Sequence, residues 1–114
     1  MAERLIDTDV LVDHLRGAQR LEPDGDDYYS VVTRAELFAG RGGDEEGLRR
    51  MLGPLGELPV DRAVAELGGR VRREAGLALG DALIAATALT HGLALLTRNR
   101  RHFERVAQLE LSRP

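Results

Sequence analysis

Acidic side chains stand at three places where an apolar, strand-like stretch gives way to a helix-like one. Asp7, with Asp9 two residues further on, ends the first such stretch. Glu36 comes in the first turn after the second stretch, and Asp81 precedes a segment that is apolar nearly all round. Carboxylate clusters suit hard cations such as Mg²⁺ and Mn²⁺, and such an ion can activate water and stabilise charge on a phosphodiester. The spacing therefore points to an acidic metal site, without fixing a reaction.

The same acids also have an ordinary structural explanation. Thr33 and Glu36 fit a capping box, in which the glutamate returns to the backbone amide of the threonine. Asp81 is a good N-cap, and Asp7 or Asp9 can cap the first helix. Acids in a first helical turn are in any case favoured by the helix macrodipole. The capping explanation is weakest for Asp7, because an acid that ends a buried strand lies near the sheet edge where ligands bind.

The elements that must position these acids alternate along the chain. Strands are expected at residues 5–8, 28–32, 58–60, 93–97 and 109–111, and helices at 10–16, 33–40, 44–52, 61–74 and 81–90, with a loop at 17–27 and a turn or short helix at 98–103. Strands that alternate with helices favour an α/β fold, here a three-layer α/β/α sandwich with a mainly parallel sheet. Residues 1–114 are expected to form one domain. The acids then fall at the carboxyl ends of strands, where functional groups of such sheets collect.

Composition limits the function classes. The net charge of −3 argues against binding of nucleic acid by bulk electrostatics alone. All 16 basic residues are arginine, a side chain suited to bidentate phosphate contact, although a GC-rich genome would also explain the absence of lysine. No apolar run approaches the ~18 residues of a membrane span, and the N-terminus lacks the apolar core of a signal peptide. With no cysteine in the chain, we expect a cytoplasmic protein.

Four segments resemble, in the right order, the motifs of PIN-domain nucleases. They are residues 5–13 (LIDTDVLVD), 30–40 (SVVTRAELFAG), 80–88 (GDALIAATA) and 95–103 (LLTRNRRHF). Together they cover nearly the whole chain and resemble the VapC branch of that family.

This resemblance implies an endoribonuclease that is the toxin of a type II toxin–antitoxin pair. Such enzymes depend on Mg²⁺ or Mn²⁺, form homodimers, cleave RNA and are silenced by a cognate VapB-type antitoxin. Asp7 and Asp81 match the metal-binding aspartates of the family and Glu36 its glutamate, so the three are the expected catalytic and metal-binding residues. We expect metal-activated water to attack a phosphodiester in line, leaving a 5′-phosphate and a 3′-hydroxyl.

The resemblance also suggests where the substrate is held. The expected substrate contacts are Thr8, Thr97, Arg98, Asn99 and Arg100, with Arg101 beside them. Thr8 matches the hydroxyl residue next to the first aspartate, and Thr97 the threonine of the fourth motif. The arginines are candidate phosphate contacts. By contrast, Arg70, Arg72 and Arg73 are expected to form the solvated face of their helix.

The sequence departs from the family pattern in two respects. Many relatives carry a fourth acid at the position of Asn99 or of His102, and here neither residue is acidic. A second metal ion is therefore in doubt, and His102 is expected to be structural or solvated rather than a proton donor. The stretch between Leu15 and Tyr28 has room only for a loop where relatives have a further helix, which would alter the RNA entrance or the antitoxin groove.

Two other functions use some of the same residues. The segment Asp7-Thr8-Asp9-Val10 also resembles the nucleophile motif of haloacid-dehalogenase-type phosphatases. Those enzymes use a lysine that this chain lacks, and their chemistry leaves Glu36 without a role. In the other alternative, a catalytically silent binding module receives an arginine-bearing partner segment in the acidic pocket. Metal-dependent RNA cleavage that Asp7→Ala abolishes would discriminate between these possibilities.

Overall fold

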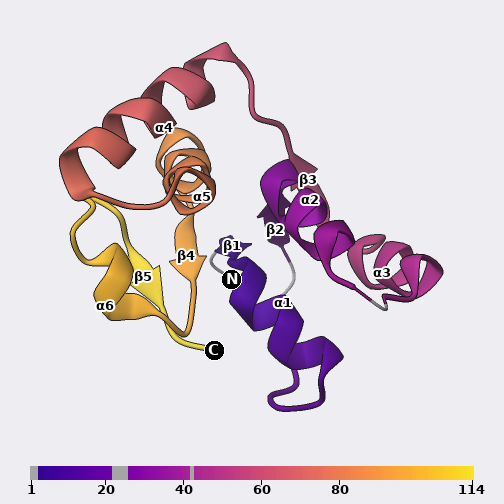
Figure 1. The fold of residues 1–114 in the computed structure, drawn as a ribbon. Helices are drawn as coiled ribbons and strands as arrows, with labels where there is room; N and C mark the ends of the chain where they lie inside the picture. Colours follow the sequence, from indigo (N-terminus) through magenta and orange to yellow (C-terminus); the bar gives the residue numbers. More distant parts are fainter. Residues whose placement is uncertain (1–2, 22–25, 42) are drawn as a thin grey trace.

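A parallel sheet between two groups of helices forms the body of the protein (Figure 1). The computed structural model describes residues 3–21, 26–41 and 43–114. Its elements are β1 (Arg4–Ile6), α1 (Thr8–Leu15), β2 (Asp27–Ser30), α2 (Val31–Ala39), α3 (Glu45–Leu52), β3 (Gly56–Leu58), α4 (Arg62–Ala75), α5 (Leu79–His91), β4 (Ala94–Leu96), α6 (Arg100–Phe103) and β5 (Leu111–Ser112). The five strands lie in the order β3-β2-β1-β4-β5, and each neighbouring pair is parallel. The predicted three-layer α/β/α sandwich is confirmed.

Successive residues of each central strand point to opposite faces of the sheet, as in any strand. Leu5 and Leu95 are paired across β1 and β4 and belong to the core that α4 and α5 cover. Ile6 and Leu96, one residue further on, are paired in the same way and belong to the core under α1, α2 and α3. All four side chains are fully buried. These parts of β1 and β4 are apolar at successive positions, because both faces of the sheet are covered.

The second predicted strand ends earlier than its β-branched residues suggested. β2 stops at Ser30, whose side-chain oxygen accepts a hydrogen bond from the Val32 backbone amide at 3.1 Å. Ser30 is thus the N-cap, and Val31 and Val32 belong to helix α2. The capping box expected at Thr33 is wrong, because Thr33 is the fully buried third residue of that helix.

The first helix also begins earlier than expected. Thr8, predicted as the last residue of a strand, is the first residue of α1, because the Asp7 carboxylate accepts its backbone N–H at 2.8 Å. Asp7 is therefore a cap, as one interpretation held. Asp81 is not a cap. It is the third residue of α5, whose N-cap position is Ala78.

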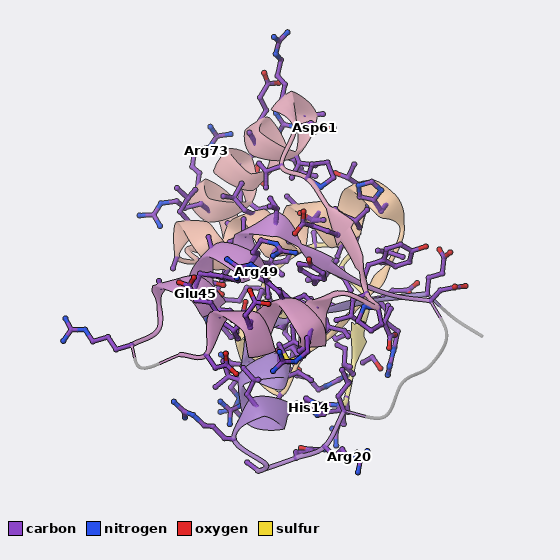
Figure 2. All side chains as sticks on the ribbon, turned by 90° about the vertical axis from the view of Figure 1, so that its right-hand side faces the viewer. His14, Arg20, Glu45, Arg49, Asp61 and Arg73 are labelled. Atoms are coloured by element: carbon purple, nitrogen blue, oxygen red, sulfur yellow. The ribbon has the colours of Figure 1, made fainter. Side chains whose placement is uncertain are left out.

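Helix α5 is buried between the sheet and α4, which explains its apolar composition on all sides. Gly68 of α4 allows the close approach, since a Cβ there would lie 2.5 Å from Leu83 Cδ2. The outer face of α4 carries the arginines predicted to be solvated, and Arg73 points away from the domain (Figure 2). Among the helices that the structure describes, none is both long and apolar enough to cross a membrane.

The segment predicted as a loop at residues 17–27 is described only at its two ends. Residues 16–19 form a turn and a bend, and Asp27 already belongs to β2, so the loop is shorter than predicted at its C-terminal end. Residues 22–25 lie outside the described part of the chain, and so does most of the prediction about this segment.

Candidate active site

A pocket of about 300 Å³ opens beyond the carboxyl ends of β1 and β4. Its lining residues are Asp7, Thr8, Asp9, Val12, Glu36, Asp81, Arg98, Asn99 and Phe103. The three predicted acids therefore share one pocket, together with a fourth carboxylate. From β1 the sheet grows in one direction through β2 and β3, and in the other direction through β4 and β5. The position between β1 and β4 is therefore the topological switch point of the sheet, where open α/β sheets usually bind ligands.

Asp7 is the most deeply placed of these acids, with 5% of its surface exposed. Its Oδ1 accepts the Thr8 backbone N–H at 2.8 Å, and its Oδ2 accepts the Thr97 hydroxyl at 2.8 Å. The Thr97 oxygen in turn accepts the Asn99 backbone N–H at 3.0 Å. The turn after β4 is thereby tied to the Asp7 carboxylate.

Glu36 reaches the pocket from α2 and is held by a chain of hydroxyl groups. The Thr8 hydroxyl donates to Glu36 Oε1 at 2.6 Å, and the Thr33 hydroxyl lies 2.9 Å from the Thr8 oxygen. Because Thr8 has one hydroxyl hydrogen and gives it to Glu36, Thr33 donates to Thr8. Glycine at position 80 leaves room for the carboxylate, since a Cβ there would lie 3.2 Å from Glu36 Oε2.

Asp81 reaches the pocket from the first turn of α5. His102 Nε2 lies 3.0 Å from Asp81 Oδ2, so His102 is attached to an acid of the site rather than merely solvated. No sequence pattern indicates this contact, because the two residues lie 21 positions apart on different helices.

Asp9, the fourth carboxylate, is only partly balanced by a cation. Arg98 Nε lies 3.7 Å from Asp9 Oδ2, while Arg98 Nη1 lies 3.0 Å from Asp13 Oδ1 on the next turn of α1. Asp9 Oδ1 is buried, and among the described residues it has no hydrogen-bond partner. Of the other predicted phosphate contacts, Arg100 does not line the pocket, and Arg101 lines an adjoining groove.

The crowding of acids changes the electrostatics of the site. Burial raises the pKa of Asp7 to about 7, and the negative charges of Asp9 and Asp81 add to the rise, against the hydrogen bonds from Thr97 and Thr8. Burial also raises the pKa of Asp9, and the neighbouring Arg98 works against that rise. Acids with raised pKa values in a cleft mark a place where positive charge would be stabilising.

The donors of the pocket fit a hard divalent cation, because all four charged ligands are carboxylates and one of their oxygens is buried and unpaired. The spacing of these carboxylates, however, does not yet form an ion site. Within the described part of the chain, no three His, Cys, Asp or Glu side chains are grouped closely enough to hold an ion. Ion binding therefore requires these carboxylates to move closer together than they lie here.

The family model of the PIN domain matches residues 4–109. The chain belongs to the PIN-domain family. Its pocket of acids at the end of β1 lies inside the matched region, and so do all four sequence motifs.

Known PIN-domain proteins resemble the chain over almost its full length. The chain is 37% identical to the ribonuclease VapC10 of Mycobacterium tuberculosis, over 93% of the chain and 90% of that protein. A toxin–antitoxin complex from Klebsiella pneumoniae contains a chain that is 30% identical, with a TM-score of 0.75 over 88% of this chain and 89% of that one. VapBC2 from Rickettsia felis, bound to a DNA fragment from its promoter, shares the fold with a TM-score of 0.82 at 19% identity, over 97% of this chain and 98% of that one.

Sequence reasoning missed two groups around this PIN-domain site. Thr33 was assigned to a helix cap, although its hydroxyl supports Thr8 and through it Glu36. Asp13 was quoted within the first motif without a role, yet it is buried and pairs with Arg98. The four-residue spacing places Asp9 and Asp13 on one helical face, but it does not indicate Arg98 as their partner.

Proposed function

We propose that this PIN-domain protein is an endoribonuclease, the toxin of a type II toxin–antitoxin pair, and that Asp7, Glu36 and Asp81 hold its Mg²⁺ or Mn²⁺. The observation that carries the proposal is the convergence of these acids, with Asp9, on one pocket at the switch point of the sheet. The similarity to a VapC ribonuclease over 93% of the chain supports RNA as the substrate. The solved relatives in toxin–antitoxin complexes support a VapB-type antitoxin as partner.

The residues of the pocket have separate tasks in this proposal. A bound Mg²⁺ or Mn²⁺ would lower the pKa of a water molecule and stabilise charge on the phosphodiester oxygens. Thr97 keeps Asp7 oriented and favours its charged form, and Thr8 keeps Glu36 oriented. Arg98, whose side chain is 55% exposed beside the pocket, is the nearest cation to meet a substrate phosphate. Asn99, at the rim, can donate to the same phosphate without adding charge.

The phosphatase alternative has no supporting observation. Both oxygens of Asp7 accept hydrogen bonds, and the cation beside the pocket is an arginine already paired with Asp13 and Asp9. The silent binding module uses the same acids, and activity decides between it and a nuclease.

The test is cleavage of a mixed RNA pool by the purified protein with Mn²⁺ or Mg²⁺. We expect cleavage that EDTA stops and that Asp7→Asn abolishes. Asp61→Asn is the matched control, because Asp61 caps α4 away from the pocket and asparagine caps helices equally well. Cleavage by Asp7→Asn at the wild-type rate, or no cleavage by the wild-type protein with either ion, would contradict the proposal.

Homodimerisation and a cytoplasmic location complete the proposal. Both follow from the resemblance to VapC proteins. Sedimentation of the purified chain tests the first, and fractionation of cells that express the protein tests the second.

A further inference from the structure

His102 supports the acidic pocket from outside it. Its Nε2 lies 3.0 Å from Asp81 Oδ2, yet the residue does not line the acidic pocket. It lines an adjoining groove on α6, together with Asn99, Arg101, Glu104 and Arg105. Because Asp81 lies between His102 and the pocket, the imidazole acts on the site through Asp81.

The second ring nitrogen identifies which form of the imidazole makes this contact. Arg105 Nη2 lies 3.4 Å from His102 Nδ1. A guanidinium group can only donate hydrogen bonds, so Nδ1 is the acceptor in this contact and carries no hydrogen. The hydrogen is then on Nε2, which donates to the Asp81 carboxylate.

The imidazole has one buried neighbour and one neighbour at the end of a helix. The ring meets the buried Phe103 edge-on, with centroids 5.3 Å apart and planes at 80°. The Arg105 guanidinium lies beside the end of α4, where its Nη1 is 3.7 Å from the position that a Cβ on Gly76 would take. The C-terminus of a helix favours a nearby cation, and the exposed Arg105 side chain lies at this end of α4.

We propose that His102, oriented by Arg105, is a positioning residue that holds one oxygen of Asp81 so that the other is presented to the divalent cation. The inference rests on the proposed function, since it concerns the same metal pocket. In this arrangement His102 supplies a hydrogen-bond donor to an acid of the pocket and adds no negative charge.

The first experiment titrates metal-free protein with Mn²⁺ by calorimetry. Loss of a partner that orients a metal ligand costs roughly 10- to 100-fold in affinity, and we expect a loss of this size for His102→Ala. His102→Gln should recover most of the affinity, because the glutamine amide places a donor at about the reach of Nε2. Thermal denaturation of each variant shows whether it is folded. Equal affinity of wild type and a folded His102→Ala would overturn the inference, as would a folded His102→Gln that is no better than His102→Ala.

Replacing Arg105 has two opposite effects on the Mn²⁺ affinity: loss of its charge raises the affinity, and loss of its contact with His102 lowers it. Removing a cation near an acidic pocket strengthens Mn²⁺ binding through charge alone. Arg101→Ala, on the same groove, measures that effect without touching His102. We expect Arg105→Ala to bind Mn²⁺ more weakly than Arg101→Ala, because His102 loses its orienting donor. Equal affinities for the two variants would show that Arg105 contributes charge only.

A spectroscopic test separates this inference from the proposed function. Nitrogen-15 NMR of the imidazole in metal-free protein, at mildly alkaline pH, should show hydrogen on Nε2 and none on Nδ1. Hydrogen on Nδ1 would overturn the inference even if the protein binds Mn²⁺ and cleaves RNA. A wild-type protein that does not bind Mn²⁺ would contradict the inference together with the proposed function, whereas loss of the His102 effect alone would leave that function standing.

Discussion

Replacing Asp7 by asparagine should stabilise the metal-free protein at neutral and alkaline pH. The folded protein raises the pKa of Asp7 from 3.8 to about 7, through burial and the neighbouring acids. Between those values the folded state keeps a proton that the unfolded chain loses, so the free energy of unfolding falls as pH rises. At about 1.4 kcal/mol per pH unit, the charge of Asp7 lowers the free energy of unfolding by about 4 kcal/mol above pH 7, and it has no such effect below about pH 4.

Asparagine removes this charge and keeps the other contacts of the site. It caps helices as well as aspartate does, and its amide can donate to the Thr97 oxygen in place of the hydrogen bond that Asp7 Oδ2 accepts. The variant also removes the repulsion that the Asp9 charge exerts on the charged Asp7 side chain. We therefore expect Asp7→Asn to be more stable than wild type by a few kcal/mol at about pH 8, and the difference to disappear at about pH 4.

Urea denaturation in EDTA, followed by circular dichroism over a series of pH values, measures this difference. Added Mn²⁺ should reverse the order at alkaline pH, because it stabilises only the protein that keeps its carboxylate. Asp61→Asn again serves as control, since Asp61 lies at the start of α4. An Asp7→Asn variant that is less stable than wild type at alkaline pH, or equally pH-dependent, would refute the argument from burial and charge.

Four further predictions concern the ion and its surroundings. The free protein should bind one Mn²⁺ per protomer, because a second ion nearby would meet a repulsion of roughly 4 kcal/mol per unit-charge pair at 4 Å and an effective dielectric near 20. Asn99→Asp should increase the affinity for a second ion and barely change the affinity for the first. If calorimetry of the wild-type protein instead shows two sites of similar affinity, and Asp9→Asn loses both, the extra ligand is Asp9. Saturating antitoxin should weaken Mn²⁺ binding if its arginine or lysine enters the pocket, and an unchanged affinity would place inhibition elsewhere. Gly80→Ala should lower RNA cleavage, because the new Cβ would lie 3.2 Å from Glu36 Oε2 and displace that carboxylate. The free energy of unfolding should stay the same or rise by up to about 1 kcal/mol, because alanine is a better helix former than glycine. Full cleavage by this variant would show that Glu36 tolerates the displacement.

The sequence was sufficient for the fold and for the acids, because both depend on patterns along single elements. Apolar strands that end in Asp7 and Thr97 place these residues at one edge of a parallel sheet, whatever their distance in the chain. The choice of cap was less predictable. Ser30 and Thr33 both precede helix-forming residues and both have hydroxyls, and only the burial of Thr33 next to Thr8 decides between them.

Contacts between side chains on different elements could not be predicted. The hydrogen bond from Thr97 to Asp7 joins residues 90 positions apart, and that between His102 and Asp81 joins two helices. Such pairs depend on helix placement to within an ångström, which apolar periodicity does not determine. The pairing of Arg98 with Asp13 belongs to the same class, and it explains why an arginine counted as a phosphate contact is already partly engaged.

The position of β1 in the middle of the sheet has a consequence for synthesis on the ribosome. The strand β1, Arg4–Ile6, lies between β2 and β4, and β4 is made nearly ninety residues later than β1. Until Ala94–Leu96 has emerged, one edge of β1 is unpaired and Asp7 lacks the hydroxyl of Thr97. A nascent chain of this protein therefore carries an incomplete pocket until β4 and Thr97 have left the ribosome. Complete assembly of the pocket, and with it any cleavage of the RNA around the ribosome, waits for that point.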